Sequence, residues 1–108
     1  MPHLTVGYEN STEIKLYYND IGTGEPLLFI HGYPFSSQAW EKEASYFVEK
    51  GFRVISYDRR GFGYSSKPSL GYDWDTFAED LNQLMTGLDL NDVTLIGHSM
   101  GTGEITRY

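Results

Sequence analysis

The residues Gly97-His98-Ser99-Met100-Gly101 have the spacing of a sharp turn that presents a serine as a nucleophile. They follow the apolar run Val93–Ile96 and precede a segment that we expect to be helical from Ser99 or Met100. Glycine on both sides suits such a turn, because neighbouring backbone passes too close there for a Cβ atom. The amides and positive dipole end of the following helix would stabilise an oxyanion. The pattern is short, so taken alone it fits an ordinary strand–helix turn equally well.

Two other segments stand directly after apolar runs and could face the same serine. His31-Gly32-Tyr33-Pro34 follows the run that ends at Ile30, and residues 58–65 follow the run that ends at Tyr57. The carboxyl ends of parallel strands meet at one edge of a sheet, so we expect these segments to lie near Ser99. Gly32 would let the backbone curve so that the Tyr33 amide faces the serine oxygen.

The spacing of apolar residues alternates between strand-like and helix-like along the chain. We expect strands at Leu4–Tyr8, Glu13–Asp20, Pro26–Ile30, Phe52–Tyr57 and Val93–Gly97. We expect helices after a cap at Ser36 or Ser37, after a cap at Asp73 or Asp75, and from Ser99 or Met100, with Gly51 ending the first in a left-handed conformation and with Trp40 and Trp74 on core faces. This order predicts an α/β protein with a mostly parallel sheet, an antiparallel amino-terminal hairpin and flanking helices.

Composition excludes several classes of function. The chain has 108 residues and a net charge of −7, without a cluster of Lys and Arg, so nucleic acid is not expected as a partner. It contains no cysteine, which excludes disulfides and thiolate metal sites, and its three histidines predict no metal centre. Neither a secretory signal nor a membrane-spanning run is visible. We therefore expect a cytoplasmic protein that does not bind membranes.

The three segments, in this order, resemble the α/β-hydrolase fold: an oxyanion loop at His31–Pro34, an Asp-x-x-Gly-x-Gly-x-Ser turn at Asp58–Ser65, and a nucleophile elbow around Ser99. The resemblance extends from about residue 22 to residue 108. Residues 57–63, 71–78 and 92–101 look most like the branch of cofactor-free haloperoxidases, perhydrolases and arylesterases, and residues 103–104 and 107–108 also fit it. The branch usually has glycine where this chain has Thr102, in the first turn of the expected helix.

This resemblance implies an enzyme that acts on carboxylic esters or acyl groups through an acyl-Ser99 intermediate, without a cofactor or metal. It implies that the backbone amides of Tyr33 and Met100 form the oxyanion hole and that Tyr33, Phe35 and Met100 line the substrate pocket. Hydrogen peroxide would replace water as acceptor in perhydrolase-like members. Structural roles are implied for His31, Gly32, Asp58, Gly61, Gly63, Gly97, His98 and Gly101, and Asp58 could also pair with Arg59 or Arg60.

A hydrolase triad requires an acid and then a histidine after the serine, and no such residues follow Ser99 within this sequence. We therefore expect residues 1–108 to be one incomplete domain, inactive alone, with an open apolar edge at Val93–Ile96. Later sequence, a second chain or a homo-oligomer would complete the sheet. Lactonase, hydroxynitrile lyase and carbon–carbon bond hydrolase activities stay open, as does an inert half-fold that assembles without turnover. Nucleotide binding is disfavoured, because neither a G-x-G-x-x-G pattern nor a Walker lysine is present.

Overall fold

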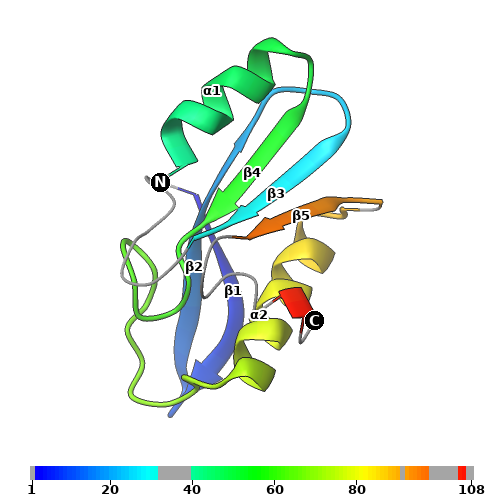
Figure 1. Ribbon diagram of the computed structural model, residues 1–108. Helices are drawn as coiled ribbons and strands as arrows, with labels where there is room; N and C mark the ends of the chain where they lie inside the picture. The colour runs from blue at the N-terminus through cyan, green and yellow to red at the C-terminus, as the bar shows by residue number, and fades with distance from the viewer. Residues whose placement is uncertain (1, 32–39, 91, 98–104, 107–108) are drawn as a thin grey trace.

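The structure, a computed structural model, describes residues 2–31, 40–90, 92–97 and 105–106 (Figure 1). Within these residues a mixed sheet has the strand order β1-β2-β4-β3-β5. The elements are β1 (His3–Glu9), β2 (Thr12–Ile21), β3 (Pro26–Ile30), α1 (Glu41–Glu49), β4 (Arg53–Tyr57), α2 (Trp74–Gly87) and β5 (Thr94–Gly97). Each predicted strand is confirmed, with ends that differ from the prediction by at most one residue.

The amino-terminal hairpin is antiparallel, as the alternation of polar and apolar residues predicted. Strands β1 and β2 pair from His3↔Tyr17 to Glu9↔Thr12, with an irregularity between Thr5 and Gly7. The two connecting residues, Asn10 and Ser11, have positive φ angles of 49° and 67°. Two successive left-handed residues are typical of the type I′ turn, whose twist matches that of the strands it joins.

The centre of the sheet is parallel and covered on both faces. Strand β3 pairs with β4 on one side and with β5 on the other, both in parallel. Four successive residues of β3, Leu27–Ile30, are buried, as are Val54–Tyr57 of β4. Continuous burial along a strand explains why both runs lack the polar alternation of β2. The predicted fold class is confirmed.

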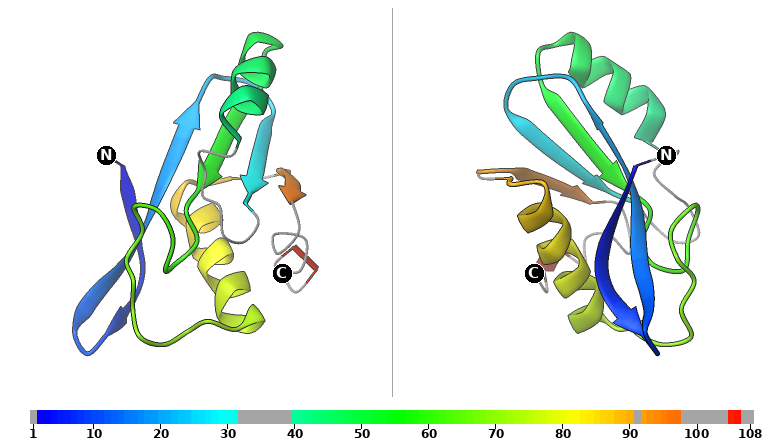
Figure 2. Two further views of the ribbon diagram at one scale, coloured as in Figure 1. Left: turned by 60° about the vertical axis from the view of Figure 1, so that its left-hand side comes forward. Right: turned by 180° about the vertical axis from the view of Figure 1, so that it is seen from behind.

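The two helices cover opposite faces of the sheet, and Figure 2 shows the separation from two sides. Helix α2 packs Leu81, Leu84 and Met85 against the inner residues of one face, where Leu16, Leu28, Ile30, Ile55 and Tyr57 gather. Helix α1 packs Ala44, Phe47 and Val48 against the other face, where Leu27, Phe29 and Val54 gather. No helix among the described residues is long and apolar enough to cross a membrane.

The helix ends decide between the predicted caps. Asp73 caps α2, because its Oδ1 accepts from the Thr76 backbone N–H at 2.8 Å. Trp40 precedes α1 without a side-chain cap bond, and Ser36 and Ser37 lie outside the described residues. Gly51 has a φ of +91°, and the pair of bonds Gly51 N–H to Val48 O (3.1 Å) and Phe52 N–H to Phe47 O (3.0 Å) ends α1 in a Schellman motif.

One core assignment is wrong. Trp40 packs against the α1-side core as predicted, with its ring 4.9 Å from that of Phe29. Trp74, the first residue of α2, instead leaves 44% of its surface exposed. Its ring lies 5.9 Å from that of the buried Phe77. Of the predicted last helix, the structure describes Ile105 and Thr106, which are helical.

Candidate active site

The carboxyl ends of the three parallel strands meet at one edge of the sheet. Ile30, the last residue of β3, pairs with Tyr57 at the end of β4 and with Gly97 at the end of β5. The three segments singled out in the sequence therefore leave the sheet side by side. This edge of an open parallel sheet is where ligands bind in α/β proteins.

Much of the predicted site lies outside the described residues. Those positions are Gly32, Tyr33, Phe35, His98, Ser99, Met100 and Gly101. The nucleophile, the oxyanion amides and the predicted substrate pocket therefore stay predictions. The structure does describe the predicted structural residues at the same sheet edge, which we call the frame of the site: His31, Asp58, Gly61, Gly63 and Gly97.

His31 joins the oxyanion-loop segment to the segment after β4. It is 1% exposed, and its Nε2 accepts the Arg59 backbone N–H at 2.9 Å. The Arg59 guanidinium returns a bond from Nη2 to the His31 carbonyl, also at 2.9 Å. Because Nε2 is an acceptor, the ring is neutral and its proton must be on Nδ1. A ring held in this way positions backbone, which is a different task from that of a general base.

Arg59 is a buried cation at the centre of this frame. It is 1% exposed, and its guanidinium lies 5.4 Å from the ring centre of Phe77 and 5.9 Å from that of Phe62. Burial lowers the pKa of Arg59 to about 10, so the side chain stays charged at neutral pH. The two ring faces and the His31 carbonyl offset part of the desolvation that this charge suffers.

Asp58 organises the turn that follows β4. It is 1% exposed, and its Oδ2 accepts the Tyr64 backbone N–H at 2.8 Å. Gly63, at a φ of +51°, passes so close to this carboxylate that an added Cβ would overlap it. The Ser65 hydroxyl donates to the Asp58 carbonyl and accepts the Tyr17 backbone N–H at 2.9 Å. These contacts tie the turn to β2 and give the glycine–serine spacing of residues 58–65 a structural reason.

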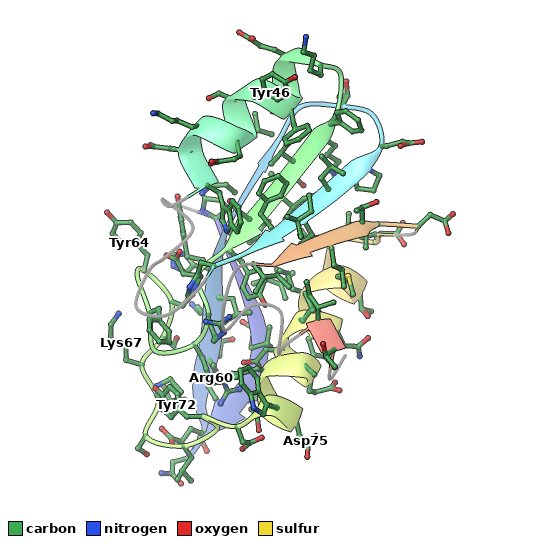
Figure 3. All side chains as sticks on the ribbon, viewed as in Figure 1. Tyr46, Arg60, Tyr64, Lys67, Tyr72 and Asp75 are labelled. Carbon is green, nitrogen blue, oxygen red and sulfur yellow. The ribbon has the colours of Figure 1, made fainter. Side chains whose placement is uncertain are left out.

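Arg60 holds the same segment against α2 (Figure 3). Its Nε and Nη2 donate to the two carboxylate oxygens of Asp80 at 2.6 and 2.8 Å, and Nη1 donates to the Leu70 carbonyl at 3.2 Å. Burial raises the pKa of the Asp80 carboxyl, and the Arg60 guanidinium opposes that rise. The bond to Asp80 raises the pKa of Arg60. Arg60 was one of the two arginines, with Arg59, that Asp58 could have paired with; Arg60 pairs with Asp80.

Sequence reasoning did not single out Asp80. The available signal was its position on α2, three residues after Phe77 and one before Leu81, within the stripe of apolar residues that faces the sheet. An acidic residue on the buried face of a helix needs a cation, and Arg60 provides it.

Among the described residues, no group of three His, Asp or Glu side chains is arranged to hold a metal ion.

Comparison with known proteins identifies the family. Residues 25–108 match the family model of the alpha/beta hydrolase fold. A non-heme chloroperoxidase from Kitasatospora aureofaciens is 52% identical over 95 residues, which are 88% of this chain and 34% of that protein. The crystal structure of a bromoperoxidase from Bacillus anthracis superimposes with a TM-score of 0.95 at 50% identity, over 99% of this chain and 38% of that one. An esterase from Exiguobacterium antarcticum superimposes with a TM-score of 0.87 at 41% identity, over 89% and 36%.

The chain therefore belongs to the α/β-hydrolase fold family, and within it to the haloperoxidase branch. The resemblance predicted from the three segments is confirmed. The chain spans between a third and two fifths of the length of the relatives it matches.

Proposed function

We propose that this protein is a serine hydrolase or acyl transferase that acts on carboxylic esters through Ser99. The observation that supports the proposal is the register of Ile30, Tyr57 and Gly97, which brings to one edge the strand ends that precede Tyr33, Asp58 and Ser99 in the sequence. The names of the related proteins support it, since they include an esterase, a chloroperoxidase and a bromoperoxidase.

In the proposed reaction the Ser99 hydroxyl oxygen attacks the ester carbonyl carbon and gives up its proton to a base. The amides of Tyr33 and Met100 donate to the oxyanion that forms. Collapse of this intermediate expels the alcohol, which takes up the proton, and leaves an acyl group on Ser99. Water then releases a carboxylic acid, or hydrogen peroxide releases a peracid, and the serine regains its proton in either case. Loss of one oxyanion donor would slow the reaction by about 10²–10³.

We infer that neither His31 nor Asp58 supplies the base or its acid partner. His31 is committed through Nε2 to the Arg59 amide, and Asp58 is committed through Oδ2 to the Tyr64 amide. We propose that an aspartate and a histidine from outside these 108 residues complete the triad and that the domain is incomplete without them. The coverage of the relatives supports this, because about three fifths of their length has no counterpart here.

A fluorophosphonate probe tests the proposal, because it labels only an activated serine hydroxyl. The wild-type protein completed by its triad partners should carry one adduct on Ser99, located by peptide mass spectrometry. The variant Ser99→Ala should carry none, whereas Ser69→Ala, which removes an exposed serine from the loop before α2, should label as the wild type does. Labelling of Ser99→Ala at the wild-type rate would refute the role of Ser99.

The alternative is an inert half-fold that assembles without turnover. No particular contact in the described residues favours it, and the probe distinguishes it directly. Perhydrolysis is a separate part of the proposal and has its own assay, in which a short-chain ester or acid and hydrogen peroxide are supplied and peracid is detected by oxidation of iodide. Ester hydrolysis without peracid formation would restrict the protein to the esterase chemistry.

A further inference from the structure

We propose that the groove between α1 and β2 binds a linear aliphatic polyamine. The groove has a volume of about 580 Å³ and lies on the α1 face of the sheet. It is lined by alternate residues of β2, including Tyr17 and Ile21, and by one side of α1. The proposal does not depend on the chemistry proposed for Ser99, because the groove is built from elements that the active site uses only as support.

One end of the groove is aromatic. Tyr17 and Tyr64 meet there edge to face with their ring centres 5.2 Å apart, and Trp40 lies at the start of α1 on the same side. In Figure 3 Tyr64 lies at the outer side of the molecule, near the first turn of α1. Rings of this kind attract an ammonium group placed over their faces.

The charges that line the groove have a single sign. Glu41 and Glu49 both contribute to it from α1, and no Lys, Arg or His is among the described lining residues. The two glutamates are separated by two turns of helix, which corresponds to a rise of about 12 Å. Between them the wall is apolar, from Ala44 and Val48 on the helix and Ile21 on the strand. The groove therefore has a carboxylate at each end and an apolar wall between them. A ligand that matches it is a chain of methylenes with an ammonium group at each end.

Ser56 of β4 adds a hydroxyl group to the lining of the groove. The residue is only 5% exposed, and it is among the residues that line the groove. A secondary ammonium in the middle of the ligand would donate a hydrogen bond to its oxygen.

Spermidine is the probe, and isothermal titration calorimetry on the full chain at low ionic strength is the measurement. We expect saturable 1:1 binding with a dissociation constant below about 1 mM. Glu41→Gln and Glu49→Gln should each weaken binding about threefold, the scale of an exposed ion pair, and the double variant about tenfold. Glu43→Gln is the matched control, because it removes the same charge from α1 at an exposed position outside the groove and should change binding less than twofold.

One further variant and one control ligand distinguish specific binding of spermidine in the groove from general electrostatic attraction to an acidic protein. Ser56→Ala should weaken binding of spermidine, and 1,8-octanediol, a neutral chain of similar length, should not bind detectably. The proposal is overturned if spermidine shows no saturable heat, if Glu43→Gln weakens binding as much as Glu41→Gln does, or if the diol binds equally well. Labelling of Ser99 by the fluorophosphonate probe is scored separately, so failure of one proposal leaves the other intact.

Discussion

The ion pair between Arg60 and Asp80 gives the sharpest test of how this fold is held together. The pair is bidentate, and the two side chains are 8% and 5% exposed. Removing one partner leaves the other charge buried without compensation, which costs about 3–5 kcal/mol in comparable sites. Because a domain is stable by only about 5–15 kcal/mol, either Asp80→Leu or Arg60→Met alone should remove a large part of the free energy of unfolding.

The double variant should be more stable than either single variant. Replacing both partners by apolar residues, as in Arg60→Met with Asp80→Leu, removes the desolvation of both ions together with their attraction. We expect this variant to be within about 1 kcal/mol of the wild type, or more stable, and clearly more stable than either single variant. Urea unfolding followed by far-UV circular dichroism measures all four proteins in one double-mutant cycle.

Two outcomes of the unfolding experiment would contradict this account of the ion pair. If each single variant loses less than about 1 kcal/mol, the pair behaves like an exposed one and its burial has been misjudged. If the double variant is as unstable as the singles added together, Arg60 and Asp80 stabilise the fold through separate contacts. The bond from Arg60 to the Leu70 carbonyl would then be the first alternative to measure.

Three further predictions concern other parts of the molecule. Leu84→Ala should cost about 2–5 kcal/mol by opening a cavity in the α2-side core, whereas Leu70→Ala, at a position 73% exposed, should cost less than about 0.5 kcal/mol by the same urea titration. Gly63→Ala should lower the thermal unfolding temperature, because the new Cβ would overlap the Asp58 carboxylate at a left-handed φ; an unchanged temperature would contradict the contact. The bond from the Thr76 amide lowers the pKa of Asp73 below 3.8, so the cap is fully formed above pH 3.8 and is lost as the pH falls through the folded-state value. Asp73→Asn keeps a cap without this charge, and its unfolding temperature relative to wild type should therefore rise as the pH is lowered below 3.8.

Most of the architecture could be predicted because the strands report their surroundings in their residue patterns. The alternation in β2 indicates one solvent face, and the unbroken apolar run of β3 indicates cover on both. Trp74 was predicted wrongly because helical spacing alone does not show how much of a side chain is covered at the first residue of a helix. The choice between Asp73 and Asp75 as cap could not be made either, since both precede suitable donors and only the path of the chain selects one.

In the candidate site, too, some residues could be predicted from the sequence and others could not. Gly61, Gly63 and Asp58 could be anticipated because a motif with fixed spacing records a local backbone requirement. The role of Asp80 could not be anticipated, because an acidic residue on an amphipathic helix ordinarily faces water. Its partner Arg60 is also twenty positions earlier in the sequence. Ser99, Tyr33 and Met100 stay predictions, which rest on the register of the strands that precede them.

The pairing of β5 has a consequence for the order in which the molecule assembles. The hairpin joins close neighbours in sequence, down to Glu9 with Thr12, whereas β5 joins β3 by pairing Leu27 with Thr94, 67 positions later. Contacts of such long range form only after the intervening loop entropy has been overcome, so we expect β5 to dock late. The strand that leads into Ser99 would then reach its place only once β3 and β4 provide a platform for it. A newly made chain would therefore form the hairpin and the β3–β4 pair before β5, the strand that precedes Ser99, is in place.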